Sequence, residues 1–131
     1  MIKVVNDLLP CEDFIATTIW PFIFVQRANE RLFDDVAENH EEIHGSQQVE
    51  MLVVGAILTL ILSSFIGWWS VLALPIYYWW YIIEFMLRSI FGTGNAYRNI
   101  SFEREAYMNE HDKDYLSKRK HFAWLKYMFN S

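Results

Sequence analysis

The sequence predicts one mainly α-helical domain, residues 1–131, with a transmembrane helical hairpin and a short N-terminal β strand or hairpin. Three observations predict this fold class. The chain carries an H-E-x-x-H motif, His40-Glu41-Glu42-Ile43-His44, whose spacing suits a helix. Between Met51 and Leu87 it is apolar apart from a single acid. Before the motif, residues 14–25 are rich in β-branched and aromatic side chains.

The composition is that of a single domain with a membrane segment. Of the 131 residues, 53% are hydrophobic and 18% aromatic, and the excess lies in one block. The formal net charge is -5, with ten acids against three bases in the first 50 residues and eight bases against five acids from Arg88 onward. Nothing in this pattern suggests nucleic-acid binding. A single cysteine, Cys11, excludes an internal disulfide and a cysteine-based zinc cluster.

Residues 14–25 are expected to form a strand or a hairpin. Pro21 has no N–H to donate, which confines it to an edge or a turn. An edge strand near Phe22 to Val25 would pair with an extended peptide, or it would only cover the apolar side of the motif helix. The first ten residues are too short and too soon acidic for a cleaved signal peptide, so an internal segment is expected to enter the membrane.

A helix over residues 34–66 is expected to carry the motif and to continue as the first membrane span. His40 and His44 are four residues apart, so they face the same side and can offer two imidazole nitrogens to one Zn²⁺. The Glu41 carboxylate beside them can take a proton from a metal-bound water. The alternative is a solvated acidic helix whose two histidines bind no metal.

The apolar block from Met51 to Leu87 is long enough for two closely joined membrane helices of about 20 residues each. Gly67-Trp68-Trp69-Ser70 is the natural turn, so the second helix is expected over residues 70–91. Glu84 is the one charge in the block; it either pairs with Arg88 four residues on or belongs to a metal site. The alternative fold is a buried hairpin in a soluble protein, but a chain this small has little else to cover it.

Two helices are expected after the membrane block. Residues 102–111 form an acidic helix, and residues 115–129 mix bases with aromatic side chains as helices that lie on anionic membrane lipid do. An ordinary packed helix is the alternative for the second segment. A hairpin returns the chain to the side it left, and the bases after Arg88 predict that this is the cytoplasmic side of a bacterial inner membrane.

Glu103-Arg104-Glu105-Ala106-Tyr107 resembles the E-x-x-A-D helix of integral-membrane gluzincins, the group that includes the prenyl-protein proteases and sensor-type metallopeptidases with transmembrane helices. The resemblance implies a zinc-protease-like helical core. It also implies that His40, His44 and Glu103 hold Zn²⁺ and that Glu41 is the general base.

Tyr107 stands where that family has an aspartate that orients a ligand, and a phenol cannot take the place of a carboxylate. Tyr107 and His111 are candidates to donate a hydrogen bond to a tetrahedral intermediate. The sequence also resembles a group of small bacterial proteins with the patterns N-H-E-x-I-H-x-x-Q-Q-x-E-M-L and Y-R-N-x-x-F-E-R-E-A-Y, here Asn39 to Leu52 and Tyr97 to Tyr107. That resemblance implies no particular activity.

The sequence thus predicts a minimal membrane-bound zinc metallopeptidase that cleaves a peptide or protein substrate. The alternative is a non-catalytic membrane subunit or scaffold that binds a partner membrane protein and keeps a structural or relic metal site. A structural zinc takes four protein ligands, so a further carboxylate from Glu84 or Glu105 would favour the alternative. Three ligands beside Glu41 favour the enzyme.

Overall fold

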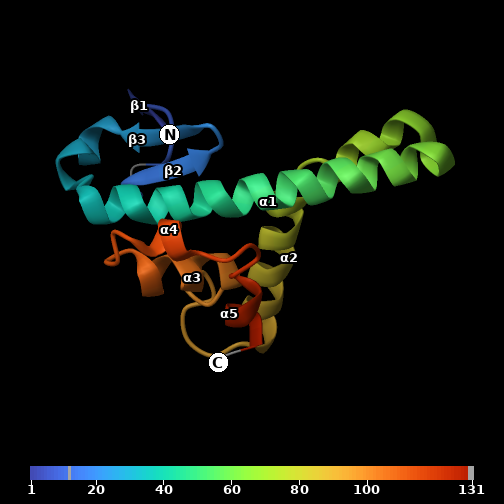
Figure 1. Ribbon diagram of the computed structural model, residues 1–131. Coiled ribbons are helices and arrows are strands. Elements are labelled where there is room, and N and C mark those ends of the chain that lie inside the picture. Colours follow the sequence, from blue (N-terminus) through green and yellow to red (C-terminus); the bar gives the residue numbers. More distant parts are fainter. Residues whose placement is uncertain (12, 130–131) are drawn as a thin grey trace.

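The computed structural model describes residues 1–11 and 13–129. Within these residues one long helix, α1 (Asp35–Ile66), lies between a small sheet and a group of shorter helices (Figure 1). The mainly helical class is as predicted, and the small β element at the N-terminal side is a three-stranded mixed sheet. The H-E-x-x-H motif lies in the part of α1 that both layers cover.

The sheet consists of β1 (Ile2–Asn6), β2 (Ala16–Ile19) and β3 (Phe22–Gln26), in the order β1-β3-β2. β2 and β3 form an antiparallel hairpin, and Pro21 lies in its turn. β1 pairs in parallel with β3 and is not among the expected elements. Its five residues are too short a pattern to predict a parallel partner, because that pairing depends on a distant part of the chain.

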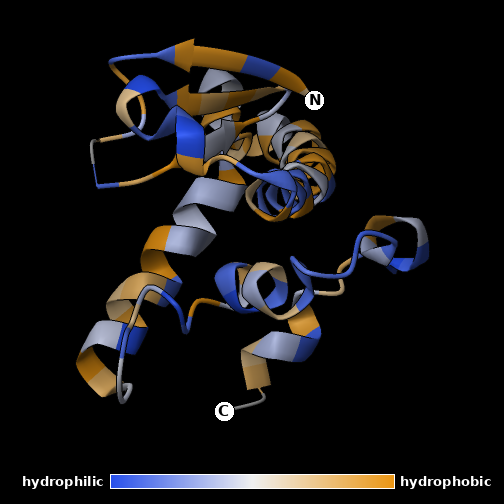
Figure 2. Ribbon diagram, turned by 90° about the vertical axis from the view of Figure 1, so that its left-hand side faces the viewer, coloured by the Kyte–Doolittle hydropathy of each residue, from blue (hydrophilic) through white to orange (hydrophobic). Residues whose placement is uncertain are grey.

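Helix α1 begins where the sequence favours a helix start. The Asp34 side chain accepts hydrogen bonds from the backbone N–H groups of Val36 and Ala37, at 3.1 and 2.9 Å, which satisfies two donors of the first turn. The helix then runs for 32 residues. Figure 2 looks along it from its start and shows hydrophilic turns in front of hydrophobic ones. The polar half carries the motif.

The predicted pair of membrane helices is not found in the described residues. After α1 the chain forms a 3-10 helix, η2 (Gly67–Ala73), and then α2 (Ile76–Phe91), which has only 16 residues. Pro75 is the physical reason, since it lacks the N–H that a continuous helix over residues 70–91 would need. One helical stretch, Asp35–Ala73, is long and apolar enough to cross a membrane.

The 3-10 segment η2 packs back against α1. Thr59 Oγ1 donates to the Ser70 carbonyl oxygen at 3.1 Å. A Cβ atom at Gly55 would lie 2.6 Å from the Ala73 carbonyl oxygen, so only glycine permits this approach. Helix α2 then leads away from α1 instead of running back beside it (Figure 1).

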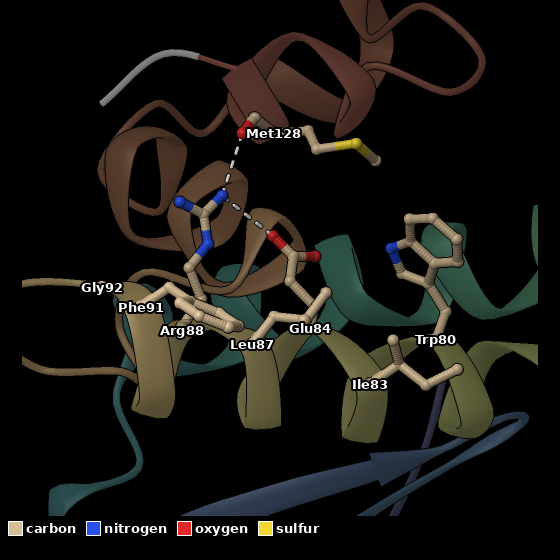
Figure 3. A pocket seen from close by; sticks show the side chains of 8 residues that line it. All are labelled: Trp80, Ile83, Glu84, Leu87, Arg88, Phe91, Gly92 and Met128. Atoms are coloured by element: carbon tan, nitrogen blue, oxygen red, sulfur yellow. Dashed lines mark hydrogen bonds and ion pairs between the residues drawn. The ribbon is translucent and has the colours of Figure 1, made fainter.

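Helix α2 is tied to the start of α3 (Ser101–Asn109) by Glu84. Its carboxylate accepts hydrogen bonds from the Ser101 backbone N–H and hydroxyl, at 3.0 and 2.6 Å. Arg88 donates to the same carboxylate at 3.2 Å and to the Met128 carbonyl oxygen at 2.9 Å (Figure 3). Glu84 therefore pairs with Arg88, which is one of the two alternatives predicted from the sequence. It also caps the helix that carries Glu103. The apolar core beside this tie consists of Met51, Tyr77, Ile100, Phe102 and Trp124.

The C-terminal segment differs from the single helix expected over 115–129. It contains two short helices, α4 (Tyr115–Lys118) and α5 (Leu125–Phe129), with Arg119 in an extended conformation after the first. The Arg119 guanidinium is buried between the carboxylates of Glu50 and Glu105. The chain leaves the helix because this side chain has to reach inward, and a surface helix has no place for it.

Candidate metal centre

The two histidines of the motif lie side by side on the buried face of α1. The Nε2 atoms of His40 and His44 are 3.1 Å apart. Their rings meet edge to face with centroids 4.8 Å apart. A separation of one helical turn brings the side chains together, and the two nitrogens point at the same space.

Glu103 brings the third ligand from α3. Its Oε2 atom lies 3.5 Å from His40 Nε2, and its Oε1 atom lies 3.4 Å from His44 Nε2. Tyr81 donates a hydrogen bond to Oε1 at 2.8 Å. The other oxygen, Oε2, is buried and has no hydrogen-bond partner among the described residues. A buried carboxylate oxygen without a donor is costly unless something else binds it.

The three side chains are close enough to share a metal ion. With zinc–ligand bonds of about 2.0–2.1 Å, the ligand atoms of a tetrahedral site lie about 3.3 Å apart. The two Nε2 atoms are 3.1 Å apart, and with one ligand atom from each residue the three atoms lie within 4.8 Å of one another. Two imidazoles and one carboxylate are a common ligand set of catalytic zinc, and Oε2 of Glu103 has no hydrogen-bond partner among the described residues. The residues present therefore form a group that could hold a metal ion.

The charges of the metal-free group suit a cation. Burial lowers the pKa of His44, but Glu103, Glu41 and Gln47 together raise it by more, and the resulting pKa is about 9. Burial raises the pKa of Glu103 in turn, yet the two histidines hold it below its ordinary range. In the absence of a metal, a proton on His44 supplies the positive charge of the group.

Glu110 orients the first histidine. Its Oε2 atom lies 2.8 Å from His40 Nδ1, so the imidazole presents Nε2 to the site. The Glu110 carboxylate thus supports a ligand, which is the task that the resembled pattern gives to an aspartate at the position of Tyr107. Glu110 is absent from the set predicted by sequence, although it follows Glu103 by seven residues, two helical turns away on the same face.

Gln47 orients the second histidine and connects it to a buried ion cluster. His44 Nδ1 lies 2.9 Å from Gln47 Oε1, and the Gln47 amide donates to Glu105 Oε2 at 3.0 Å. Arg119 binds Glu105 at 2.6 Å and Glu50 at 2.6 Å. Glu105 is thus engaged by the cluster and does not join the ligands. Neither Gln47, which lies inside the first sequence pattern, nor Arg119 is among the predicted site residues.

Glu41, the predicted base, is buried beside the histidines and faces the edge of the sheet. Thr18 Oγ1 donates to its Oε2 atom at 2.7 Å. Tyr107 lies against His40, with ring centroids 4.7 Å apart, and the Arg98 guanidinium covers its ring. Burial and the nearby Glu103 carboxylate raise the pKa of Tyr107, which keeps the phenol protonated. His111 is exposed and lies near Glu110, outside the group.

Two adjoining cavities lead to the centre from opposite directions. One, of about 420 Å³, is lined by β2, His44, Glu103 and several tyrosines. The other, of about 520 Å³, is lined by His40, Tyr107 and Glu110, and both cavities include Glu41. The edge strand beside the centre is β2 and not the predicted strand near Phe22 to Val25, because β3 is central in the sheet.

The similarity of this chain to known proteins is confined to its motifs. No protein-family model matches it, and no curated protein or solved structure does so either. The resemblance to membrane gluzincins thus depends on the motif residues alone. What the structure adds is that His40, His44 and Glu103, far apart in sequence, form one buried group suited to a metal ion.

Proposed function

We propose that this protein is a membrane-bound zinc metallopeptidase. The observation that carries the proposal is the buried group of His40, His44 and Glu103, whose ligand atoms lie within 4.8 Å of one another beside a cavity that Glu41 also lines. Zinc, when bound there, would polarise a substrate carbonyl and lower the pKa of a water molecule. The four residues have the chemistry that hydrolysis of a peptide bond needs.

The number of protein ligands favours catalysis over a structural role. A structural zinc needs a fourth protein ligand. Glu84 is engaged by Ser101 and Arg88, and Glu105 is engaged by Gln47 and Arg119. Neither carboxylate joins the group, so the fourth position is left for a water molecule or a substrate. This is the main argument against a scaffold that keeps only a structural metal.

The protein groups have separate tasks in the proposed reaction. Glu41 takes a proton from the attacking water and passes it to the leaving amine, and Thr18 holds the carboxylate in place. Glu110 and Gln47 fix the two imidazoles so that each presents Nε2. The Tyr107 phenol is protonated and can donate to a developing oxyanion.

The distribution of apolar surface supports attachment to a membrane. The second half of α1 and the outer face of α2 expose many large apolar side chains, far more than a soluble monomer tolerates. Leu52–Ile66 spans about 22 Å at 1.5 Å per residue, enough to enter a bilayer core of about 30 Å. The exposed side chains are Leu52, Val53, Ile57, Leu60, Ile61, Phe65 and Ile66 on α1 and Trp79, Ile82, Ile83, Phe85, Met86, Leu87, Ile90 and Phe91 on α2.

We therefore place the protein in a bacterial inner membrane, with the apolar half of α1 and η2 inserted and the metal centre on the cytoplasmic side. The basic residues after α2 favour this orientation, because cytoplasmic segments next to membrane helices are enriched in lysine and arginine. Its partners would be membrane lipid and a peptide or protein substrate that reaches the membrane surface.

The test is zinc content and peptide hydrolysis of the detergent-purified protein. Wild type should hold about one equivalent of zinc, and His44→Ala should lose it. Glu41→Gln should keep the zinc and cleave peptides at least about 100-fold more slowly, since it lacks only the base. His111→Ala, which removes an exposed histidine, is the matched control. Wild type without zinc after metal supplementation would refute the proposal.

A further inference from the structure

Strand β2 has one edge paired and one edge turned to the cavity. The Gln26 backbone N–H donates to the Ile15 carbonyl oxygen at 3.0 Å, so Ile15 faces β3. In an antiparallel pair successive residues alternate between the two sides. The backbone groups of Ala16, Thr18 and Trp20 therefore point to the free edge, toward α1 and the metal centre.

Gln48 occupies one end of that free edge. Its Oε1 atom accepts a hydrogen bond from the Trp20 backbone N–H at 2.8 Å. Its Nε2 atom donates to the Thr18 carbonyl oxygen, also at 2.8 Å. A residue of a neighbouring parallel strand would bind the same two groups in the same way, so the side-chain amide imitates one residue of a strand. What Gln48 leaves for another chain is the N–H and C=O of Ala16 and the N–H of Thr18.

Gln48 also stands at a boundary between cavities. Together with Ile19, Tyr77 and Tyr78 it lines both the cavity at the metal centre and a smaller one of about 250 Å³ farther along α1. In the opposite direction the cleft continues past Phe14, Ala16 and Glu41 toward the start of α1. At the border between the first two cavities, the two hydrogen bonds of Gln48 therefore occupy the edge of β2.

We propose that Gln48 sets the length of the substrate on the tyrosine-lined side of the metal. This inference rests on the proposed peptidase function. From His44 to Gln48 is four residues, about 6 Å along the helix, which equals about two residues of extended chain. A peptide pairs with Ala16 and Thr18, its chain ends against Gln48, and the scissile bond lies about two residues from that end. The substrate class is a peptide cut close to an apolar terminus.

The experiment uses the zinc-loaded full chain and a nested set of apolar peptides, lengthened one residue at a time at either end. Mass spectrometry measures cleavage of each peptide and gives its kcat/KM. Fluorescence anisotropy measures binding of each peptide to the zinc-loaded Glu41→Gln variant. For wild type, kcat/KM should fall about tenfold or more once the peptide extends more than about two residues beyond the scissile bond on the Gln48 side. A longer chain must displace the two hydrogen bonds between the Gln48 side chain and the backbone of β2. Extension at the other end should have no such effect.

Two variants of Gln48 separate its hydrogen bonds from its bulk. Gln48→Ala removes both and should abolish the length limit, whereas Gln48→Met keeps the bulk and should weaken the limit without abolishing it. Zinc content and thermal melting establish that both variants fold. Cleavage without a length limit in wild type, or an unchanged limit in Gln48→Ala, would refute the role of Gln48 alone. Neither cleavage nor binding of any peptide by zinc-loaded protein would refute the peptidase function itself.

Discussion

The two halves of α1 have opposite environments. From Asn39 to Met51 most side chains are buried, and most of the buried ones are polar: two histidines, two glutamines, two glutamates and an asparagine. From Leu52 to Ile66 the side chains are mostly apolar and largely exposed, and only Gly55 is buried. One continuous helix therefore turns a polar half inward and leaves an apolar half outside, the reverse of the distribution in a soluble protein.

The comparison shows that different interactions hold the two halves. The first half is held by side-chain hydrogen bonds and ion pairs to the sheet, to α3 and to Arg119. The second half is held mainly by the backbone of η2 at Gly55 and Thr59. Substitutions in the first half should therefore change stability and metal binding. Substitutions of the exposed apolar side chains in the second half should change only the interaction with lipid.

The largest effect on folding is expected from Arg119→Leu. The Arg119 side chain is 4% exposed and joins Glu50 and Glu105, so its loss removes the cation between two buried carboxylates. Breaking a buried pair costs about 3–5 kcal/mol of unfolding free energy. Thermal or denaturant unfolding in detergent would measure it, with Lys113→Ala as the control, because the ion pair of Lys113 with Asp35 is exposed. An unchanged midpoint for Arg119→Leu would show that the ion cluster does not hold the polar half.

A somewhat smaller effect is expected from pH in the chelator-treated protein. The pKa of His44 rises from 6.5 to about 9 on folding, since Glu103, with Glu41 and Gln47, more than offsets burial. A group with a raised folded pKa stabilises the protein fully below its unfolded pKa and loses that contribution as pH passes the folded value. Unfolding free energy should thus fall by about 3 kcal/mol between about pH 6.5 and pH 9.

Thermal melts across this range would check it, with His44→Ala as the comparison. The variant should lack this part of the pH dependence, because the group that titrates is gone. Zinc-loaded protein should lack it too, since zinc binds neutral imidazole, and zinc affinity should rise toward pH 9 as His44 loses its proton. A metal-free wild type as stable at pH 9 as at pH 6.5 would contradict the assigned His44–Glu103 pair.

Leu60→Asp tests the apolar half. Leu60 is 73% exposed, so the substitution should leave the melting temperature in detergent nearly unchanged. An aspartate in the middle of a membrane helix costs about 2.5–3.5 kcal/mol, so binding to lipid vesicles should weaken by about 100-fold. Leu8→Asp is the matched control, since Leu8 is 83% exposed but lies beside the sheet. Equal vesicle binding by Leu60→Asp and wild type would show that this half does not meet lipid.

The parts of the structure that sequence could predict are those with a local signal. The motif spacing and the later E-x-x-A pattern were enough to name His40, His44 and Glu103, which the structure brings together. The long apolar run predicted a helix but not its ending, because the 3-10 turn at Gly67 and the departure of α2 depend on how η2 meets Gly55. Length and hydropathy alone do not encode that contact.

The residues that sequence missed act through contacts between distant segments. Gln47 bridges α1 and α3, Arg119 reaches from the C-terminal segment into the core, and β1 pairs with β3 of the hairpin. Gln47 lies inside the first sequence pattern and Arg119 inside neither, but nothing in the sequence indicates the contacts that they make, which only the tertiary structure shows. Glu110 is the exception, because its seven-residue spacing from Glu103 was visible in the sequence.

Glu110→Gln should give the smallest of these effects and separates orientation of a ligand from ligation itself. The amide keeps the size of the side chain and can still bond His40 Nδ1, but it lacks the carboxylate charge. Zinc affinity should fall by about 10–100-fold, the usual cost of losing such a support, with stoichiometry retained. Titration against a chelator would measure the affinity. The Co²⁺ absorption spectrum would show whether the ligand set is intact, which should hold for Glu110→Gln and fail for Glu103→Gln. Loss of the spectrum in Glu110→Gln would instead make Glu110 a ligand and move the centre toward the start of α1.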